Sequence, residues 1–390
     1  MRVAVVGYGA AGQAVAILAQ RAGCTVDVFE RVASPGPVGA GFLLQPTGLW
    51  ALEQLGLAQA ARAVGAPVEQ LLGETPRGRR VMDLRYAASG DGLEGLGLQR
   101  GALFQILHEA MPTEVRLLPG HEVCAVDAEG GMLTTADTQA HGPYALLILA
   151  DGAASQLRNT RELQRDRPYR WGAAWGLCAA PPWLGRRLMQ RYGGTRQMTG
   201  LLPVGRLPGE DPAVQRACFY WSAPADQLDS ICEAGLAQVQ TALQRLWPEA
   251  AEWLAAQPEL RLHAARYRDA VSRRPGSGRV IRIGDALHAM SPQLGQGVNL
   301  ALLDAIALGR ALAAAPGAGP EAWRQHLQQA RSRHVAVYQW LSRWLTPWFQ
   351  SDAAWLGPLR DALAGPTARV PGLDRLAARV LSGRLGWPDS

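Results

Sequence analysis

The start of the chain has the apolar segments of a strand, a helix and a second strand. Four apolar residues follow Arg2, and residues 2–6 are typical of a buried parallel strand. Residues 14–21 begin with six apolar residues and predict an apolar helix, and residues 25–29, rich in β-branched and aromatic side chains, predict a second strand that ends in Glu30. Strand, helix and strand in this order predict a fold of the α/β class with a Rossmann-like parallel sheet.

The middle of the chain has the short, turn-bounded apolar runs of an antiparallel sheet. Gly193-Gly194 predicts a hairpin between two of these runs, and residues 226–247 predict a helix that stops at Pro248. The sheet is expected as an insertion between two parts of the α/β domain. Strands are expected at residues 68–72, 79–84, 144–150, 171–179, 187–192, 198–204, 217–222 and 260–267, with a small meander at residues 115–118, 122–127 and 132–135.

The last part of the chain returns to strand and helix patterns. An apolar strand at residues 280–283 leads through a polar loop and a glycine turn into an apolar helix. After a linker, residues 321–350 predict a helix with Trp340, Trp344 and Trp348 four residues apart. A tryptophan stripe at this spacing most often packs in a core or against another subunit, and an interfacial membrane helix is the alternative.

The composition is that of a globular protein, because 48% of the 390 residues are hydrophobic and 18% are charged. There is no uninterrupted run of 18 apolar residues, so no membrane span is expected. The strand that starts at residue 2 makes a cleaved signal peptide unexpected. Five cysteines without a CxxC spacing predict a reduced, cytoplasmic setting and no metal site.

The net charge of +6 comes from arginine alone, since the sequence contains no lysine. The absence of lysine excludes a Schiff-base lysine, and with it pyridoxal-phosphate chemistry, and it also excludes a P-loop lysine. The arginines are spread along the chain rather than clustered with aromatic residues. Nucleic-acid binding is therefore not expected.

The first strand runs directly into the glycine motif G-x-G-x-x-G. Gly7 makes the tight turn, Gly9 lets a pyrophosphate approach the backbone, and Gly12 lets the following helix pack close to the strand. Glu30 follows about twenty residues later, where a carboxylate accepts the ribose hydroxyls of an adenine dinucleotide. Strand, helix, second strand and acid all have the spacing of a dinucleotide-binding unit.

Two later strands also end in an acid and a glycine. Residues 144–150 run into Asp151-Gly152 and an expected helical turn at residues 153–158. Residues 280–283 run into Gly284-Asp285 and then into the turn at residues 295–297, which opens a helix. The positive end of this helix favours an anionic ligand group, and its glycines let a flat ligand approach the backbone.

These three stretches resemble the fingerprints of the FAD-dependent aromatic hydroxylases, the single-component flavoprotein monooxygenases with the p-hydroxybenzoate hydroxylase fold. The matching segments read GYGAAG with Glu30, DGAASQLR from Asp151, and GDALHAMSPQLGQGVN from Gly284. Arg100, Leu103 and Leu107 match a further helix of the family, with Arg100 placed to meet a phosphate. The resemblance covers about residues 1–315.

The resemblance implies that FAD is the cofactor and NAD(P)H the co-substrate. It places Pro292 beside the reactive edge of the flavin and leaves a catalytic role open for His288. On the inserted sheet, Tyr192, Arg196 and Tyr220 are candidates for substrate contact. The cofactor-binding residues it implies are Gly7, Gly9, Gly12, Glu30, Arg31, Arg100, Asp151, Arg158, Asp285, Gly295, Gly297, Val298 and Asn299.

The implied fold is a Rossmann-like FAD-binding domain with an inserted antiparallel-sheet substrate domain and C-terminal helices. We expect the FAD-binding domain to be built from three separate parts of the chain. The expected boundaries are residues 1–66, 99–160 and 275–315 for the FAD-binding parts, 67–98 for the first substrate-domain strands, 161–274 for the substrate-binding sheet and 321–390 for the C-terminal helical region.

The implied reaction is hydroxylation of a small aromatic or polyketide-like substrate with NAD(P)H and O2 through a flavin C4a-hydroperoxide. A related FAD oxidoreductase acting on an isoprenoid-like substrate and a non-catalytic flavin-binding scaffold remain the alternatives. The expected partners are the substrate and O2, without nucleic acid or a membrane span, and a homodimer is allowed. The sequence does not choose between NADH and NADPH.

Overall fold

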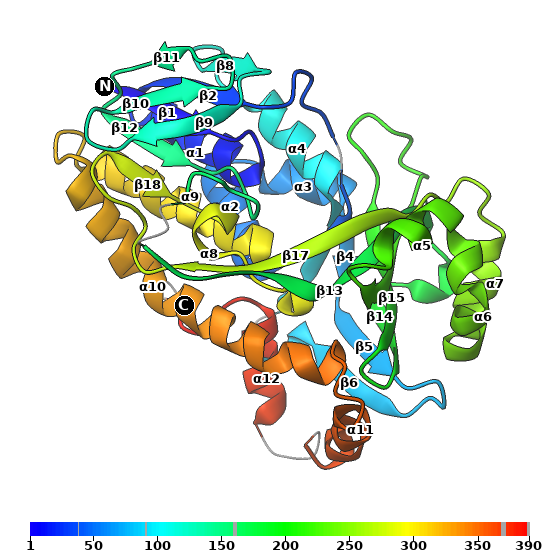
Figure 1. Cartoon of the computed structure of the whole chain (residues 1–390). Helices are drawn as coiled ribbons and strands as arrows, with labels where there is room; N and C mark the ends of the chain where they lie inside the picture. Colours follow the sequence, from blue (N-terminus) through cyan, green and yellow to red (C-terminus); the bar gives the residue numbers. More distant parts are fainter. Residues whose placement is uncertain (38, 90–91, 159–161, 368–371, 388–390) are drawn as a thin grey trace.

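A computed structural model describes residues 1–37, 39–89, 92–158, 162–367 and 372–387 (Figure 1). Its first domain contains a five-stranded parallel sheet with the strand order β18-β12-β1-β2-β8. The expected Rossmann-like sheet is confirmed, and the ends of β1, β2, β12 and β18 bring the three motifs to one edge. The strands are β1 (Arg2–Val6), β2 (Thr25–Glu30), β8 (Arg116–Pro119), β12 (Leu146–Leu149) and β18 (Val280–Arg282).

Apolar helices cover one face of the parallel sheet, and a small sheet covers the other. Val5 and Ile148 share a core with Ile17 of the first helix and Leu302 of the long helix α9. Phe29 and Leu147 pack against Leu133 of the small sheet. The helices are α1 (Ala10–Arg21), α2 (Pro46–Leu55), α3 (Ala58–Val64), α4 (Arg100–Glu109) and α9 (Gly297–Ala314), and the small sheet contains β9 (Val123–Asp127), β10 (Met132–Thr135) and β11 (Ala140–His141).

The second domain is a seven-stranded sheet with the order β17-β13-β16-β15-β14-β5-β6. The expected hairpin at Gly193-Gly194 is confirmed, because β14 and β15 pair antiparallel across it. In Figure 1 the long strands β13 and β17 run from this sheet to the first domain. The strands are β5 (Gln70–Glu74), β6 (Arg80–Arg85), β13 (Leu163–Ala179), β14 (Arg187–Gly193), β15 (Gln197–Gly205), β16 (Arg216–Pro224) and β17 (His263–Ser272).

The two faces of this sheet have different neighbours. Phe219 and Trp221 pack on three helices that cover one face. The other face contacts the first domain through a three-stranded sheet, where Cys218 and Val204 pack with Leu43. The helices are α5 (Leu228–Ala234), α6 (Leu236–Leu246) and α7 (Pro248–Ala255), and the three-stranded sheet has β3 (Gly41–Leu44), β7 (Gly95–Gln99) and β4 (Ala66–Val68) in that order.

Three local predictions are wrong. The helix expected over residues 226–247 is broken at Gly235, whose φ of +67° an α-helix does not allow, and Pro248 begins the next helix. Residues 153–158 form turns and bends instead of a helical turn. The strand expected at 115–118 is β8, which joins β2 in parallel instead of forming the meander, because strand pairing depends on partners distant in sequence.

The chain ends in three helices, of which α10 runs along the first domain, whereas α11 and α12 lie against β6 of the seven-stranded sheet (Figure 1). Trp340 and Trp344 are 62% and 53% exposed, so the core interpretation of the tryptophan stripe is wrong for both, while a subunit contact stays a prediction. Among the described residues, only α9 has the length and composition to cross a membrane, and 72% of it is buried, as in a core helix. The C-terminal helices are α10 (Pro320–Phe349), α11 (Leu356–Thr367) and α12 (Leu373–Leu381), and the short helix α8 (Asp285–His288) precedes α9.

Candidate active site

The first glycine turn combines two tightly packed glycines with one that borders open space. Gly7 has a φ of +98°, and a Cβ there would lie 2.6 Å from the Ala150 carbonyl oxygen. A Cβ at Gly12 would lie 1.9 Å from the Gly7 carbonyl oxygen. A Cβ at Gly9 would meet nothing within 4 Å among the described residues. The turn therefore holds helix α1 against strand β1 and leaves room above Gly9, at the helix N-terminus, for an anionic group.

The Glu30 carboxylate is held beside this turn. Its Oε2 accepts the Tyr8 N–H at 2.8 Å, and its Oε1 accepts the Val32 N–H at 2.9 Å. Each carboxylate oxygen can accept a second hydrogen bond, so Glu30 still has acceptor capacity for ribose hydroxyls. Arg31 is exposed.

The Gly284-Asp285 turn and the start of α9 lie next to each other. A Cβ at Gly297 would lie 3.8 Å from the Asp285 Oδ1, so the carboxylate is close to the first turn of the helix. Gly295 has a φ of +61° and ends a short 3₁₀ turn that begins at the exposed Pro292. The backbone N–H groups of Gly297 and Val298 are at the positive end of an 18-residue helix.

The Asn299 side chain joins the start of α9 to the start of α2. Its Oδ1 accepts the Gln45 N–H at 2.8 Å, and its Nδ2 donates to the Gly295 carbonyl at 2.8 Å. A Cβ at Gly48 would lie 2.0 Å from the Asn299 Oδ1, which explains the glycine in helix α2. Asn299 therefore shapes the glycine turn through its side chain.

Gln45 carries a buried donor that has no partner. Its side chain is fully buried, and its Oε1 accepts the Tyr86 hydroxyl at 2.5 Å. Its Nε2 has no hydrogen-bond partner within the described chain and lies 3.8 Å from the Cβ position of Gly295. An orphaned buried N–H costs free energy, so this amide is suited to a ligand at the glycine turn. Gln45 was not among the residues predicted from the sequence. The only sequence signal for a site there was a polar residue between an apolar strand and a helix-starting proline.

Arg158 joins the two acid–glycine turns. Its Nε donates to the Ala286 carbonyl at 2.9 Å, and its Nη2 donates to the carbonyls of Asp285 at 2.9 Å and Gly152 at 3.1 Å. Burial lowers the pKa of Arg158. Burial also raises the pKa of Asp151, whose Oδ1 has no hydrogen-bond partner among the described residues. The structure thus gives Arg158 an anchoring position, while Asp151 keeps an unused acceptor.

His288 is buried beside Asp304 of α9. Its Nε2 lies 2.5 Å from the Asp304 Oδ2, which also accepts the Gly284 N–H at 2.9 Å. Burial lowers the pKa of His288, but the Asp304 carboxylate outweighs it, so the pKa is raised above its ordinary value. In this position the His288 ring anchors α8 to α9, and a catalytic role for His288 stays a prediction.

The same carboxylate connects to the C-terminal segment. The Asp304 Oδ1 accepts from the Arg331 Nε at 2.9 Å, and the His334 Nδ1 accepts from the Arg331 Nη1 at 2.7 Å. The His334 Nε2 donates to the Gly383 carbonyl at 2.6 Å. Burial and the Arg331 cation lower the pKa of His334 to about 3, which keeps its ring neutral as this bonding requires. No local sequence motif indicated this hydrogen-bond network.

Two tyrosines of the seven-stranded sheet share one glutamine. The Tyr192 hydroxyl donates to the Gln190 Oε1 at 2.6 Å, and the Gln190 Nε2 donates to the Tyr220 hydroxyl. The ring of Tyr192 packs against Phe349, and the Arg360 guanidinium lies 4.8 Å from its centroid. Burial raises the pKa of both tyrosines. Tyr192 therefore has structural partners, whereas Tyr220 keeps its own hydroxyl proton as a donor.

The two predicted arginine contacts have different surroundings. Arg196 is in the turn after β14, with a side chain that is 61% exposed and lies 3.7 Å from Asp352, so it faces the surface rather than Tyr220. Arg100 begins α4, and its N–H donates to the Ala40 carbonyl at 3.1 Å. Burial raises the pKa of Tyr267, and the nearby Arg100 cation opposes this rise. Arg100 therefore lies where α4 meets the second sheet.

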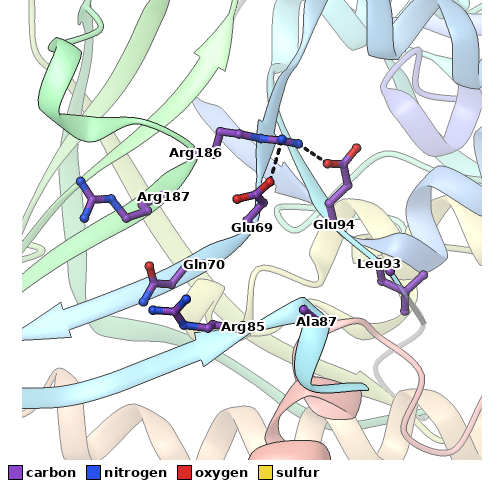
Figure 2. Close-up of a pocket in the computed structure, with 9 residues that line it drawn as sticks. Glu69, Gln70, Arg85, Ala87, Leu93, Glu94, Arg186 and Arg187 are labelled. Carbon is purple, nitrogen blue, oxygen red and sulfur yellow. Dashed lines mark hydrogen bonds and ion pairs between the residues drawn. The ribbon is translucent and has the colours of Figure 1, made fainter. Parts of the chain in front are cut away.

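A separate pocket of about 560 Å³ is at the outer joint between the two domains (Figure 2). Arg186 extends across it, with the Glu69 carboxylate at 2.7 Å and the Glu94 carboxylate on its other side. Among the described residues that line this pocket, none has a buried side-chain polar atom without a hydrogen-bond partner, in contrast to Gln45 and Asp151 at the glycine turns.

The residues at the sheet edge fit a flavin dinucleotide. The open space at Gly9 would admit a pyrophosphate, the remaining acceptor capacity of Glu30 would suit a ribose, and Asp285 would lie near the chain that connects them to the ring. The Gly297 amide and the orphaned Gln45 Nε2 are donors for a ring with carbonyl acceptors.

If the Gln45 amide donates to FAD, a Gln45→Leu variant should bind FAD about three- to tenfold more weakly, because the loss of one hydrogen bond weakens binding by about this factor. Tyr86→Phe is the matched control, because it breaks the same hydroxyl–amide bond but retains the Nε2 donor. Titration of each apoprotein with FAD measures the affinities, and thermal unfolding measures the shared structural cost. Equal FAD affinity in the two variants would contradict the assignment.

Comparison with known proteins gives one family. Residues 1–340 match the FAD binding domain family. The chain is 26% identical over 323 residues to the aurachin C monooxygenase/isomerase of Stigmatella aurantiaca, covering 80% of each chain. It is 29% identical over 379 residues to the 3-amino-4-hydroxybenzoate 2-monooxygenase of Streptomyces cremeus, covering 87% of this chain and 85% of the relative.

A solved structure supports the fold independently. HpxO of Klebsiella pneumoniae, complexed with FAD and uric acid, superposes with a TM-score of 0.80 at 21% identity. The similarity covers 100% of this chain and 98% of HpxO. At 21% identity this similarity shows the fold alone, that is, the arrangement of the two domains and the C-terminal helices.

Proposed function

The chain belongs to the FAD binding domain family and is an FAD-dependent monooxygenase, and from this premise we propose that it hydroxylates a small aromatic molecule with NAD(P)H and O2. The observation that carries the proposal is the Gln45 donor beside the Gly295 turn, which has no partner among the described residues. Gln45 follows the strand of Leu43, which packs with Cys218 and Val204 of the seven-stranded sheet. A buried donor near this apolar sheet face suits a planar cofactor with a substrate on the side of the sheet.

Residues at each turn would hold the cofactor. Gly9 and Glu30 would bind the adenosine half of FAD. Asp285 would bind the chain that connects this half to the flavin ring, and the backbone amides of Gly297 and Val298 would bind the flavin ring. When bound, FAD supplies hydride acceptance from NAD(P)H and the activation of O2. The N-terminus of α9 favours negative charge at the ring, since its backbone N–H groups and dipole are fixed in place.

The second sheet would position the substrate. Gln190 donates to the Tyr220 oxygen, so the Tyr220 hydroxyl proton is available to a phenol or carbonyl oxygen of the substrate. The sheet face around Cys218 is largely apolar, because Cys218 packs with Val204 and Leu43. Such a face excludes water from the reacting atoms and favours an aromatic ring over a highly charged molecule.

The relatives indicate which substrates to try first. Their names refer to aurachin C and 3-amino-4-hydroxybenzoate, and the second name describes an aromatic ring that bears a hydroxyl and an amino group. We propose this class for the present chain. A cytoplasmic setting belongs to the proposal, supported by five free cysteines, and a homodimer stays a prediction.

A substrate panel tests the proposal. The FAD-loaded protein is mixed with NADH or NADPH and with phenols, aminohydroxybenzoates or quinolones, and nicotinamide oxidation is followed by absorbance. We expect at least one member to stimulate oxidation, and we expect Tyr220→Phe to weaken that stimulation. A flavin that neither nicotinamide reduces in the presence of any panel member would overturn the proposed reaction.

A further inference from the structure

Exposed apolar side chains are concentrated at one end of the molecule. Of the nine large hydrophobic side chains that are exposed among the described residues, seven are in α10, α11, α12 and the connection before α11. Isolated apolar residues on a surface are ordinary, but such a concentration marks an interaction surface. The seven, which we call the C-terminal apolar patch, are Trp340, Trp344, Trp355, Leu359, Leu363, Leu373 and Leu376.

The patch is built from successive helical turns. Trp340 and Trp344 stack with centroids 6.2 Å apart and planes at 6°, and both remain more than half exposed. Trp355 and Leu359 are four residues apart, and they are 67% and 39% exposed. The Arg360 Nη1 donates to the Trp348 carbonyl at 3.1 Å, which ties α11 to the end of the tryptophan helix. Figure 1 shows α11 and α12 together below the end of α10.

Arginines flank the apolar residues. Arg375 and Arg379 are one turn apart on the exposed side of α12, next to Leu376, and Arg333 is exposed on α10. Within the part of the chain that the structure describes, none of these three guanidinium groups has an acidic partner. On the exposed side of α12, Arg375 and Arg379 are accompanied by one acidic residue, Asp374, so the charge of this helix beside the patch is net positive.

We propose that the C-terminal apolar patch docks the enzyme on the surface of an anionic lipid bilayer. Indole rings favour the boundary between headgroups and hydrocarbon, because they combine a large apolar body with one N–H donor. Arginines beside them gain from the negative potential of the lipid surface. Amphipathic helices with this arrangement lie in the plane of the interface and do not span the membrane.

The charges favour a lipid surface over a second copy of the chain. A two-fold contact through the patch would bring Arg375 and Arg379 of one copy against the same positive surface of the other. Like charges in such a contact oppose association. An anionic bilayer complements the same charges, so it is the occupant that fits both the indoles and the guanidinium groups.

Vesicle flotation of the FAD-loaded full chain tests the docking. Vesicles of phosphatidylglycerol mixed with phosphatidylcholine are compared with vesicles of phosphatidylcholine alone. We expect binding to the anionic vesicles, weakened by salt, and little binding to the neutral ones. Trp340→Gln with Trp344→Gln, and separately Arg375→Gln with Arg379→Gln, should each weaken it about tenfold or more. The control pair Arg116→Gln with Arg245→Gln removes the same charge from exposed sites elsewhere and should bind like the unchanged protein.

Thermal unfolding and the flavin absorbance of each variant confirm that the fold and the FAD site are intact. Failure of the unchanged protein to float with anionic vesicles overturns the proposal. Equal losses in the Arg375→Gln with Arg379→Gln variant and in the control pair also overturn it, since net charge alone would then explain the binding. A dimer that the tryptophan changes dissociate, without any vesicle binding, assigns the patch to a second copy instead.

Discussion

A Gly9→Ala variant is expected to bind FAD at least about tenfold more weakly than the unchanged protein, a loss of about 1.4 kcal/mol, while the apoprotein keeps its stability. Gly9 has φ −77° and ψ −173°, a conformation that alanine adopts without strain. Nothing among the described residues lies within 4 Å of the added Cβ. A loss of affinity without a loss of stability would therefore show that the ligand occupies this space.

Gly12→Ala is the matched comparison. Its added Cβ would lie 1.9 Å from the Gly7 carbonyl oxygen, so the packing of α1 on β1 must change. This variant should lose both apoprotein stability and FAD affinity. Thermal unfolding of the apoprotein and titration with FAD separate the two effects. Unchanged FAD affinity in Gly9→Ala would place the pyrophosphate elsewhere.

Removal of the Asp304 carboxylate is expected to destabilise the folded protein by about 3–5 kcal/mol, because it leaves Arg331 buried without its counter-charge. Asp304 is fully buried and bonds His288, Arg331 and the Gly284 N–H. Although burial opposes ionisation, its cationic partners hold the pKa of Asp304 well below the usual range. The carboxylate therefore stays ionised in the folded protein at neutral pH.

Denaturant unfolding of Asp304→Ala measures this loss. Asp229→Ala is the control. Asp229 forms an ion pair with Arg266, but its side chain is 72% exposed, so its removal should change the unfolding midpoint little. Because Asp304 also orients the Gly284-Asp285 turn, Asp304→Ala should release FAD more readily than the control. A midpoint equal to that of Asp229→Ala would show that the network does not stabilise the fold.

The parts of the site that the sequence predicted are those encoded by neighbouring residues. Gly7, Gly9 and Gly12 belong to one turn, and Glu30 ends the next strand, so their spacing alone predicted their meeting. Asp285 and Gly297 were predicted in the same way, from one strand and the following helix. Local geometry connects such residues, which is why periodicity and turn chemistry were enough.

Contacts between distant segments were not predictable in this way. The bond between Gln45 and Asn299 joins positions 254 residues apart, and the His334–Gly383 bond joins α10 to the turn that follows α12. Arg158 matches a family motif, but its hydrogen bonds to backbone carbonyls depend on where the third motif folds. The side on which Trp340 lies likewise depends on how α10 packs, which helical spacing does not specify.

Oxygen transfer is the most direct test of the central claim. The panel member that best stimulates NAD(P)H oxidation is incubated with the FAD-loaded protein under isotopically heavy O2, and the product is analysed by mass spectrometry. A flavoprotein monooxygenase inserts one heavy oxygen atom into the product and stops when O2 is removed. Continued product formation without O2, or a product free of the heavy isotope, would contradict the account and favour an oxidoreductase of another kind.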